Sequence, residues 1–186
     1  AMGTVVAGAI GGAAGSVASQ GVGIATGVQN KFSFKQVAMG AISGAVGGAL
    51  KGVDFAAKLG NLGKAADFAN GAIRGGLGSI ATQGIGVATG LQNRFDFAGV
   101  AAAAIGGGIT AHAASRLGAH MATLPPEKQL PANVITGLAG AVGGLGNAAT
   151  RSLVNGTSFG DNLIAALPDI IGSTIGNMAG DGITPD

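Results

Sequence analysis

Residues 15–34 read GSVASQGVGIATGVQNKFSF, and residues 78–97 read GSIATQGIGVATGLQNRFDF. Thirteen of the twenty positions are identical, and the two copies are displaced by 63 residues. A fainter third copy ends in VNGTSFGDN, at residues 154–162. A segment that recurs within a chain is a unit of architecture, because each copy is one supersecondary element that packs on its neighbours. The sequence therefore predicts a repeat architecture and says little about activity.

Small residues recur at helical spacing on both sides of each copy. Residues 4–29 contain no charged residue, and the stretch after the first copy has glycine at every fourth position. Each glycine inside a helix costs roughly 1 kcal/mol relative to alanine, so these rows are expected where helix backbones approach closely. The predicted helix-packing residues are Gly8, Gly12, Gly23, Gly27, Gly40, Gly44, Gly48, Gly107, Gly172 and Gly176.

A turn with helix-capping signals follows the glycine-rich part of each copy. In the first copy Asn30 suits the left-handed residue that ends a helix, and Ser33 suits an N-cap with Gln36 completing a capping box. Phe32 and Val37 occupy the positions of a hydrophobic staple, and we expect the phenylalanine pairs to be core anchors. The predicted turn and capping residues are Asn30, Phe32, Ser33, Phe34, Asn93, Phe95, Asp96, Phe97, Asn155, Ser158 and Phe159.

These signals predict one all-α domain over residues 1–186, built from three glycine-rich αα-hairpin repeats packed as a close helical bundle. A helix, a capped turn and a second helix make up each repeat. The linkers contain short amphipathic segments or prolines, and the second one is expected to be an exposed loop. The repeats are predicted at roughly 4–52, 68–114 and 132–180, and the linkers at 53–67 and 115–131.

The composition excludes several classes of protein. Only 10 % of the 186 residues are charged, against about 25 % in an average globular protein. The net charge of +2 gives no electrostatic footprint for nucleic acid. Because the chain has no cysteine, disulfides, cysteine–metal sites and thiol catalysis are excluded. The chain begins and ends in similar material, so we expect it to be a segment of a longer protein.

The candidates for chemistry are weak. His112 and His120 lie eight residues apart without a third ligand at a metal-like spacing, and Asp161 and Asp169 are likewise eight apart. Glycine strings that resemble GxGxxG are expected by chance in so glycine-rich a chain, and no strand precedes them. The sequence therefore predicts no catalytic, cofactor-binding or metal-binding residue, no small-molecule substrate and no enzyme activity.

The composition of these helices raises the question of whether they lie in a membrane or in water. Residues 4–29, 78–93 and 98–111 lack charge, 34–50 contains Lys35 as its one charge, and all four approach or reach spanning length. The chain has no Trp or Tyr for interfacial belts and shows no clear asymmetry of Lys and Arg. The sequence favours a soluble, closely packed bundle and leaves insertion of the hairpins into a membrane open.

The repeated pattern GS[VI]A[ST]QG[VI]G[IV]ATG[VL]QN[KR]F[SD]F resembles Gly/Ala-rich segments of large bacterial exoproteins of the polymorphic-toxin and filamentous-haemagglutinin-like kinds. This resemblance implies a secreted or cell-surface protein with a place in the delivery or presentation of a toxin to a target cell. It implies a structural or pretoxin module whose partners are neighbouring domains of a larger polypeptide. The alternative is a membrane-active glycine-zipper module that inserts for toxin translocation or pore formation, and unmatched glycine faces could also form a homodimer.

Overall fold

The structure is a computed structural model and describes residues 2–181. This part of the chain folds into six α-helices joined by turns and three short 3₁₀ helices, and contains no β-strand. The expectation of an all-α protein is confirmed. The helices are α1 (Met2–Ala25), α2 (Phe34–Leu50), α3 (Ala66–Ala88), α4 (Phe97–Met121), α5 (Ala132–Asn155) and α6 (Phe159–Asp181).

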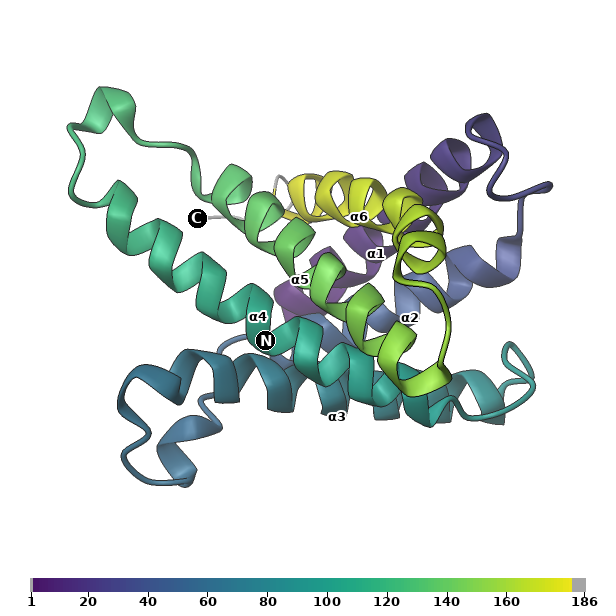
Figure 1. Cartoon of the computed structure of the whole chain (residues 1–186), viewed down its shortest axis with the longest axis horizontal. Helices are drawn as coiled ribbons and strands as arrows, with labels where there is room; N and C mark the ends of the chain where they lie inside the picture. Colours follow the sequence, from purple (N-terminus) through teal and green to yellow (C-terminus); the bar gives the residue numbers. More distant parts are fainter. Residues whose placement is uncertain (1, 182–186) are drawn as a thin grey trace.

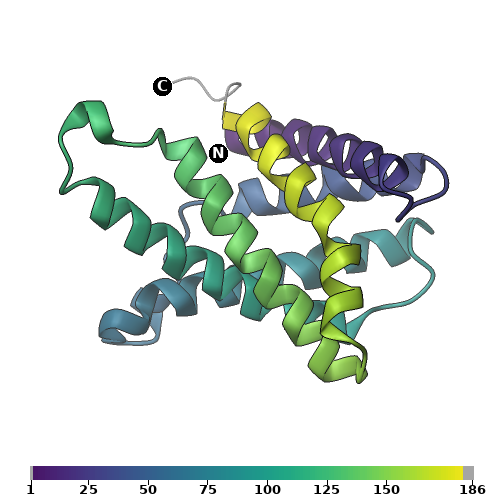
Figure 2. The same ribbon diagram turned by 45° about the horizontal axis from the view of Figure 1, so that its top comes forward.

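The helices form a closed ring in which each helix packs against two others. Helix α1 packs on α2 and α6, α6 packs on α5, α5 on α4, α4 on α3, and a smaller contact between α3 and α2 closes the ring (Figure 1). The turns that follow α1, α3 and α5 lie in the right half of Figures 1 and 2, and the two linkers lie on the left. The three turns therefore lie at one end of the described fold, and the two linkers lie at the opposite end.

A left-handed glycine follows the end of the helix at each of these turns. Only glycines have positive φ among the described residues, since a Cβ would clash in the left-handed region. The prediction that Asn30 holds this conformation was therefore wrong. Its counterparts Asn93 and Asn155 do not hold it either, and Asn155 is the last residue of α5. The left-handed glycines at the three turns are Gly27, Gly90 and Gly156, with φ of 74°, 72° and 65°.

Gly27 also corrects the list of helix-packing positions. Helix α1 ends at Ala25, and a Cβ built on Gly27 would meet nothing within 4 Å. The residue is needed for its backbone conformation, because the chain must reverse direction before α2. The amide of Gln29 then donates to the Gly23 carbonyl at 2.9 Å and closes the end of the helix.

The boundaries of the linkers differ from the predicted ones. Helix α4 continues to Met121, so residues 115–121 of the predicted second linker are helical. No proline occurs before Pro125, and the alanine-rich sequence therefore carries the helix on. The first linker contains the 3₁₀ helices η1 (Ala56–Lys58) and η2 (Gly63–Ala65), and the second contains η3 (Pro126–Lys128).

Helices α1 and α2 touch backbone to backbone. A Cβ added to Gly44 would lie 1.9 Å from the carbonyl oxygen of Gly8, and one added to Gly12 would lie 2.1 Å from that of Gly40. On the α3–α4 pair, a Cβ on Gly107 would lie 2.5 Å from the Gly71 oxygen. Distances this short leave no room for any side chain, so glycine is a steric requirement at these contacts.

A second glycine face of α1 packs against α6. A Cβ on Gly11 would lie 2.6 Å from the carbonyl oxygen of Gly176, and a Cβ on Gly15 would lie 2.8 Å from that of Gly172. Helix α6 bends along its length (Figure 2), and Pro168 lies inside it, where a proline removes a helix hydrogen bond. Helix α1 therefore makes close glycine contacts on two faces, one with α2 and one with α6.

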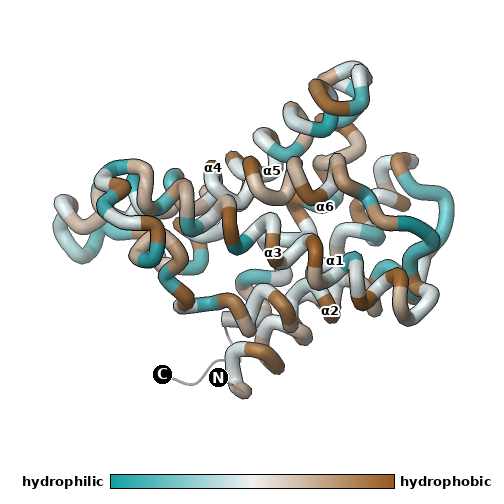
Figure 3. The backbone as a smooth tube through the Cα atoms, turned by 90° about the horizontal axis from the view of Figure 1, so that it is seen from below, coloured by the Kyte–Doolittle hydropathy of each residue, from teal (hydrophilic) through white to brown (hydrophobic). Residues whose placement is uncertain are grey.

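Small side chains fill the interior, and the large apolar side chains lie outside. The buried apolar residues of the described part, apart from glycines, are five alanines and Pro168. Apolar positions recur along all six helices (Figure 3), yet no Leu, Ile, Val, Met or Phe is among the buried ones. The accessible surface is 10207 Å², whereas a soluble monomer of 17.5 kDa has about 7,900 Å². The buried alanines are Ala7, Ala56, Ala102, Ala139 and Ala148.

Candidate functional site

The turn between α1 and α2 is organised by the buried side chain of Gln20. Its Oε1 accepts the amide of Ser33 at 2.5 Å and Nε2 of Gln29 at 3.1 Å. Its own Nε2 donates to the Ser33 carbonyl at 3.1 Å and to Oγ of Ser16 at 3.4 Å. Gln20 is 1 % exposed, so these bonds form away from solvent and fix the chain that enters α2 against α1.

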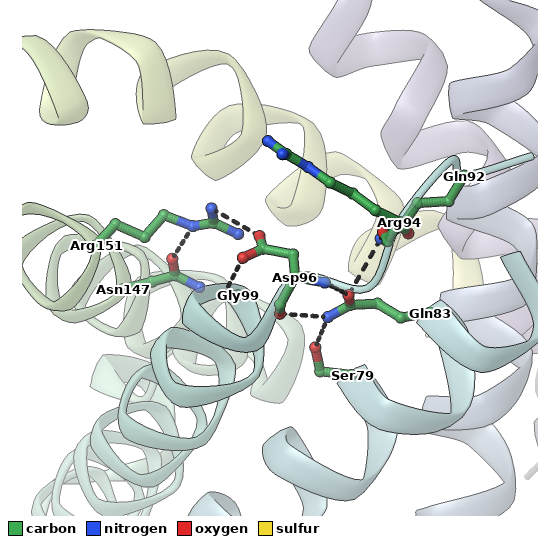
Figure 4. A network of polar contacts seen from close by, with 8 residues as sticks. All are labelled: Ser79, Gln83, Gln92, Arg94, Asp96, Gly99, Asn147 and Arg151. Carbon is green, nitrogen blue, oxygen red and sulfur yellow. Dashed lines mark hydrogen bonds and ion pairs between the residues drawn. The ribbon is translucent and has the colours of Figure 1, made fainter. Parts of the chain in front are cut away.

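The turn between α3 and α4 repeats this arrangement around Gln83, as Figure 4 shows. Oε1 of Gln83 accepts the amide of Asp96 at 2.6 Å and Nε2 of Gln92 at 3.1 Å. Nε2 of Gln83 donates to the Asp96 carbonyl at 3.1 Å and to Oγ of Ser79 at 3.0 Å. The two copies therefore form the same hydrogen-bond network in addition to having similar sequences.

The three predicted N-caps lie at the starts of helices. Oγ of Ser33 accepts the Gln36 amide at 3.4 Å, Oδ1 of Asp96 accepts the Gly99 amide at 2.9 Å, and Oγ of Ser158 accepts the Asp161 amide at 3.5 Å. The capping box at Ser33 was predicted wrongly in one respect. The Ser33 amide donates to Gln20 and not to Gln36, because Gln20 reaches it from the neighbouring helix.

At least one ring of each aromatic pair lies at the surface, which corrects the prediction that both rings are core anchors; Phe95 is half-buried. Phe34 is 83 % exposed and Phe97 is 79 % exposed. Both are the first residue of a helix that starts at the turn, and the interior beside them is filled by small residues and by the glutamine networks. Each contacts its partner ring: centroids lie 5.2 Å apart for Phe32–Phe34 and 4.9 Å apart for Phe95–Phe97. Phe159, at the third turn, is also exposed.

Two polar contacts join different helix pairs. Nη1 of Arg151 on α5 lies 3.2 Å from Oδ2 of Asp96, and its Nε donates to Oδ1 of Asn147 at 3.3 Å (Figure 4). The hydroxyl of Ser19 on α1 donates to the carboxylate of Asp169 on α6. The two aspartates therefore act in helix–helix contacts. The N-cap is Ser33 at the first turn and Asp96 at the second, and only Asp96 also pairs with an arginine, Arg151.

Two hollows lie in the described chain. A groove of about 1400 Å³ runs along α1, α2 and α6, and its wall includes glycines from all three helices. Its polar groups include Ser19 and Asp169, which bond to each other. A smaller opening of about 650 Å³ lies between the second turn and α5, beside Arg94 and Arg151. Among the described residues, no three His, Asp or Glu side chains are grouped as metal ligands would be, and His112 and His120 both lie on α4.

Three helices are long and apolar enough to cross a membrane, by length and composition: Met2–Ala25, Phe97–Met121 and Phe159–Gly180. Large apolar side chains lie exposed on them at helical spacing. On α1 the stripe comprises Met2, Val6, Ile10, Val17 and Ile24, and on α6 it comprises Ile164, Leu167, Ile171, Ile175 and Met178. The α1 stripe lies on the side of the helix opposite its glycine faces, because it is separated from them by about half a helical turn.

Sequence reasoning did not identify Gln20 and Gln83 as the centres of the turns. The signal was available, since both glutamines lie thirteen residues before the capping residue in their copies. Comparison with known protein families, with curated proteins and with solved structures finds no match to this chain.

Proposed function

We propose that this chain is a membrane-active module of three glycine-rich helical hairpins, which pack through small residues and turn their apolar faces toward lipid. The observation that carries this proposal is the distribution of apolar side chains. The buried ones are alanines and Pro168, and the exposed ones include Ile, Leu, Val, Met and Phe along helix faces. This is the arrangement expected where the solvent is hydrocarbon.

The physical basis is the difference between the two solvents. In water, burial of large apolar side chains is the main force that brings helices together, and a large exposed apolar patch marks an interaction site. In a bilayer that force is missing between helices, because lipid tails are as apolar as leucine. Helices then associate through close backbone contacts at Gly, Ala, Ser and Thr. The α1–α2 and α1–α6 contacts use such residues.

The dimensions are suitable for a bilayer. Helix α1 has 24 residues and α4 has 25, which correspond to about 36 Å of helix. The hydrocarbon core of a bilayer is about 30 Å thick. The buried glutamine networks satisfy the polar groups of the turns internally, which lowers the cost of moving the turns toward lipid.

The resemblance to Gly/Ala-rich exoprotein segments supports a setting for this activity. We infer that the module belongs to a secreted or cell-surface bacterial protein and assists delivery of a neighbouring toxin domain. The hairpins supply the membrane contact, and the neighbouring domain supplies the effect on the target cell.

The test is co-flotation of the purified chain with lipid vesicles, together with release of a trapped dye. Wild-type protein is expected to float with vesicles and to release dye. A variant with Val6, Ile10 and Val17 all changed to Ser should bind about a thousandfold more weakly, since each substitution loses about 1.5 kcal/mol of apolar burial. A control with Ser at the exposed Ala49, Ala57 and Ala81 should bind as the wild type does.

A second function, a soluble structural or pretoxin module that supports its neighbour, is favoured by charges within the helices. Arg74 lies in α3, Arg116 in α4 and Asp169 in α6, and a charge at the centre of a bilayer is costly. Arg74 donates to the Val53 carbonyl at 3.0 Å through Nε, as it would in a soluble bundle. Wild-type protein that stays at the bottom of the flotation gradient, with helical content unchanged by lipid, would establish this function over the membrane-active one.

A further inference from the structure

Each turn presents one large apolar side chain almost fully to the outside. Phe34 is 83 % exposed at the first turn, Phe97 is 79 % exposed at the second, and Leu153 is 86 % exposed just before the third. Among the described residues, only Met2 has a comparable exposure for a large apolar side chain. We call the surface formed by residues 26–35, 89–97 and 151–161 the turn end.

Basic side chains accompany the exposed phenylalanines. Lys31 and Lys35 flank Phe34, and Arg94 occupies the position of Lys31 in the second copy; all three are exposed. Arg151 is the fourth base of the turn end, and it pairs with Asp96. With Asp161 as the other acid, the turn end has four basic and two acidic residues, a net charge of +2.

The backbone that carries these side chains is held in the same way at both turns. Nε2 of Gln29 donates to the carbonyl of Lys31 at 2.7 Å, and Nε2 of Gln92 donates to the carbonyl of Arg94 at 2.6 Å. These donors are themselves bonded to the buried Gln20 and Gln83. An exposed aromatic residue beside a base is therefore presented on a braced turn, with little further ordering needed on binding.

We propose that the turn end is the docking surface for an anionic phospholipid bilayer. Phe34 and Phe97 enter the interfacial layer, and Lys31, Lys35 and Arg94 meet the headgroup phosphates. An amphipathic surface with aromatic residues and bases binds such membranes through buried apolar area and charge attraction together. The inference rests on the proposed function, and it adds the class of lipid and the end of the molecule that makes contact first.

The linker end provides a matched control, because it lies on the opposite side of the fold (Figures 1 and 2). Leu59 is 60 % exposed there, and Lys58, Lys64 and Lys128 are exposed bases. The turn variants are F34S/F97S and K31Q/K35Q/R94Q. The control variants are L59S and K58Q/K64Q/K128Q. All the changed side chains are exposed, and circular dichroism checks that each variant keeps its helical content.

Binding is measured by flotation with phosphatidylcholine vesicles and with vesicles that also contain phosphatidylserine. Wild-type protein is expected to bind the phosphatidylserine vesicles more tightly, and added salt should weaken this binding. The loss of three bases should lower affinity for them about a hundredfold, at roughly fivefold for each base. F34S/F97S should lower affinity for both vesicles at least about tenfold. Both control variants should bind as the wild type does.

A second measurement uses the lack of tryptophan in the chain. The single-tryptophan variants F34W and L59W are mixed with vesicles whose lipids carry bromine on the acyl chains, which quenches nearby indole fluorescence. F34W is expected to be quenched more strongly than L59W. If wild-type protein binds vesicles but the turn variants bind equally well, or L59W is quenched more strongly, the docking surface is wrong and the membrane-active function stands. If wild-type protein binds neither kind of vesicle, both proposals are wrong.

Discussion

At the scale of single residues, the buried Gln20 and Gln83 stabilise the turns by hydrogen bonds to the backbone amide and carbonyl of Ser33 and Asp96. Changing Gln20 to Leu keeps the size of the side chain but leaves the amide and carbonyl of Ser33 without their partners. Each buried polar group left unpaired costs about 1–3 kcal/mol. We therefore expect Gln20→Leu to lower the free energy of unfolding by roughly 2–4 kcal/mol, measured by urea denaturation and circular dichroism.

The control for this change is Gln36→Leu. Gln36 is exposed, and the hydrogen bond that its side chain accepts from Nε2 of Gln29, at 3.3 Å, lies at the surface. Surface substitutions of this kind change stability by about 0.5 kcal/mol or less. Equal effects of the two substitutions would show that the network around Gln20 contributes nothing specific to stability.

Asp54, in the first linker, gives the fold a dependence on pH. The hydrogen bond from Nδ2 of Asn70, at 2.9 Å, and the bond from the Ala57 amide, at 3.1 Å, lower the pKa of the Asp54 carboxyl below its ordinary value of 3.8. Because the folded pKa lies below the unfolded one, the stabilisation is present above the unfolded pKa. It is lost as the pH falls through the folded pKa.

The measurement is an NMR titration of the Asp54 carboxyl together with amide exchange at Ala57. We expect a midpoint below 3.8 and, as the carboxyl is protonated, less protection of the Ala57 amide from exchange relative to an unstructured amide at the same pH. In Asn70→Ala the midpoint should move up toward the ordinary value, because the largest cause of the lowered pKa is removed. An Asp54 midpoint that stays the same in Asn70→Ala would contradict this assignment.

The sequence predicted the residues of the turns better than their roles. Ser33, Asp96 and Ser158 were predictable as N-caps, because capping depends on local backbone and a short polar side chain. Phe34 and Phe97 were wrongly predicted to be buried, because a position next to a helix start does not determine whether other helices pack over the side chain. Gln20 was missed because its partners Gln29 and Ser33 lie nine and thirteen residues away, across a turn whose path depends on the left-handed Gly27.

At the scale of helices, the glycine contacts predict opposite effects for two alanine substitutions in α2. Gly44→Ala would place a Cβ 1.9 Å from the Gly8 oxygen, so the helices must move apart. Overpacking of this kind costs about 1–3 kcal/mol or more. Gly47→Ala, three residues on, meets nothing within 4 Å and should stabilise the helix by roughly 0.5–1 kcal/mol.

Urea unfolding of the two variants measures this difference in sign. The pair is matched in chemistry and in helix, so general effects of alanine on helix formation are the same in both. Stabilisation by Gly44→Ala would mean that α1 and α2 are not in backbone contact. A loss of stability in Gly47→Ala would mean that its face of α2 packs against something else.

The rows of glycine were predictable as helix contacts because their four-residue spacing places them on one face. The ends of the helices were less predictable. Helix α4 runs beyond the predicted end of its repeat because alanine continues to favour helix where no breaker intervenes. A left-handed residue was predicted at Asn30, although Gly27, three residues earlier, supplies that conformation at lower steric cost.

At the scale of the whole molecule, closure of the ring depends on which helix faces meet between distant parts of the chain. The spacing of Gly11 and Gly15 indicates a packing face on α1 but does not identify α6 as its partner. Their contacts with Gly172 and Gly176 close one side of the ring, and the Asp96–Arg151 pair ties α4 to α5. That pair is about 40 % exposed, so it contributes only about 0–1 kcal/mol, and the glycine contacts dominate.

The large exposed surface also determines the heat capacity of unfolding. A typical chain of 186 residues gains about 2.4 kcal/mol/K on unfolding, mainly because buried apolar surface becomes hydrated. Here the folded chain already exposes about 2,300 Å² more than a typical monomer of its mass, and most of its large apolar side chains are outside. We expect differential scanning calorimetry of the monomer to give a heat-capacity change clearly below the typical value. Sedimentation at the same concentration serves as the control, because association through the apolar stripes or unmatched glycine faces would bury surface and raise the heat-capacity change. A monomer with the full typical value would contradict the exposed arrangement of the helix faces, since the large apolar side chains would then have to be buried before unfolding.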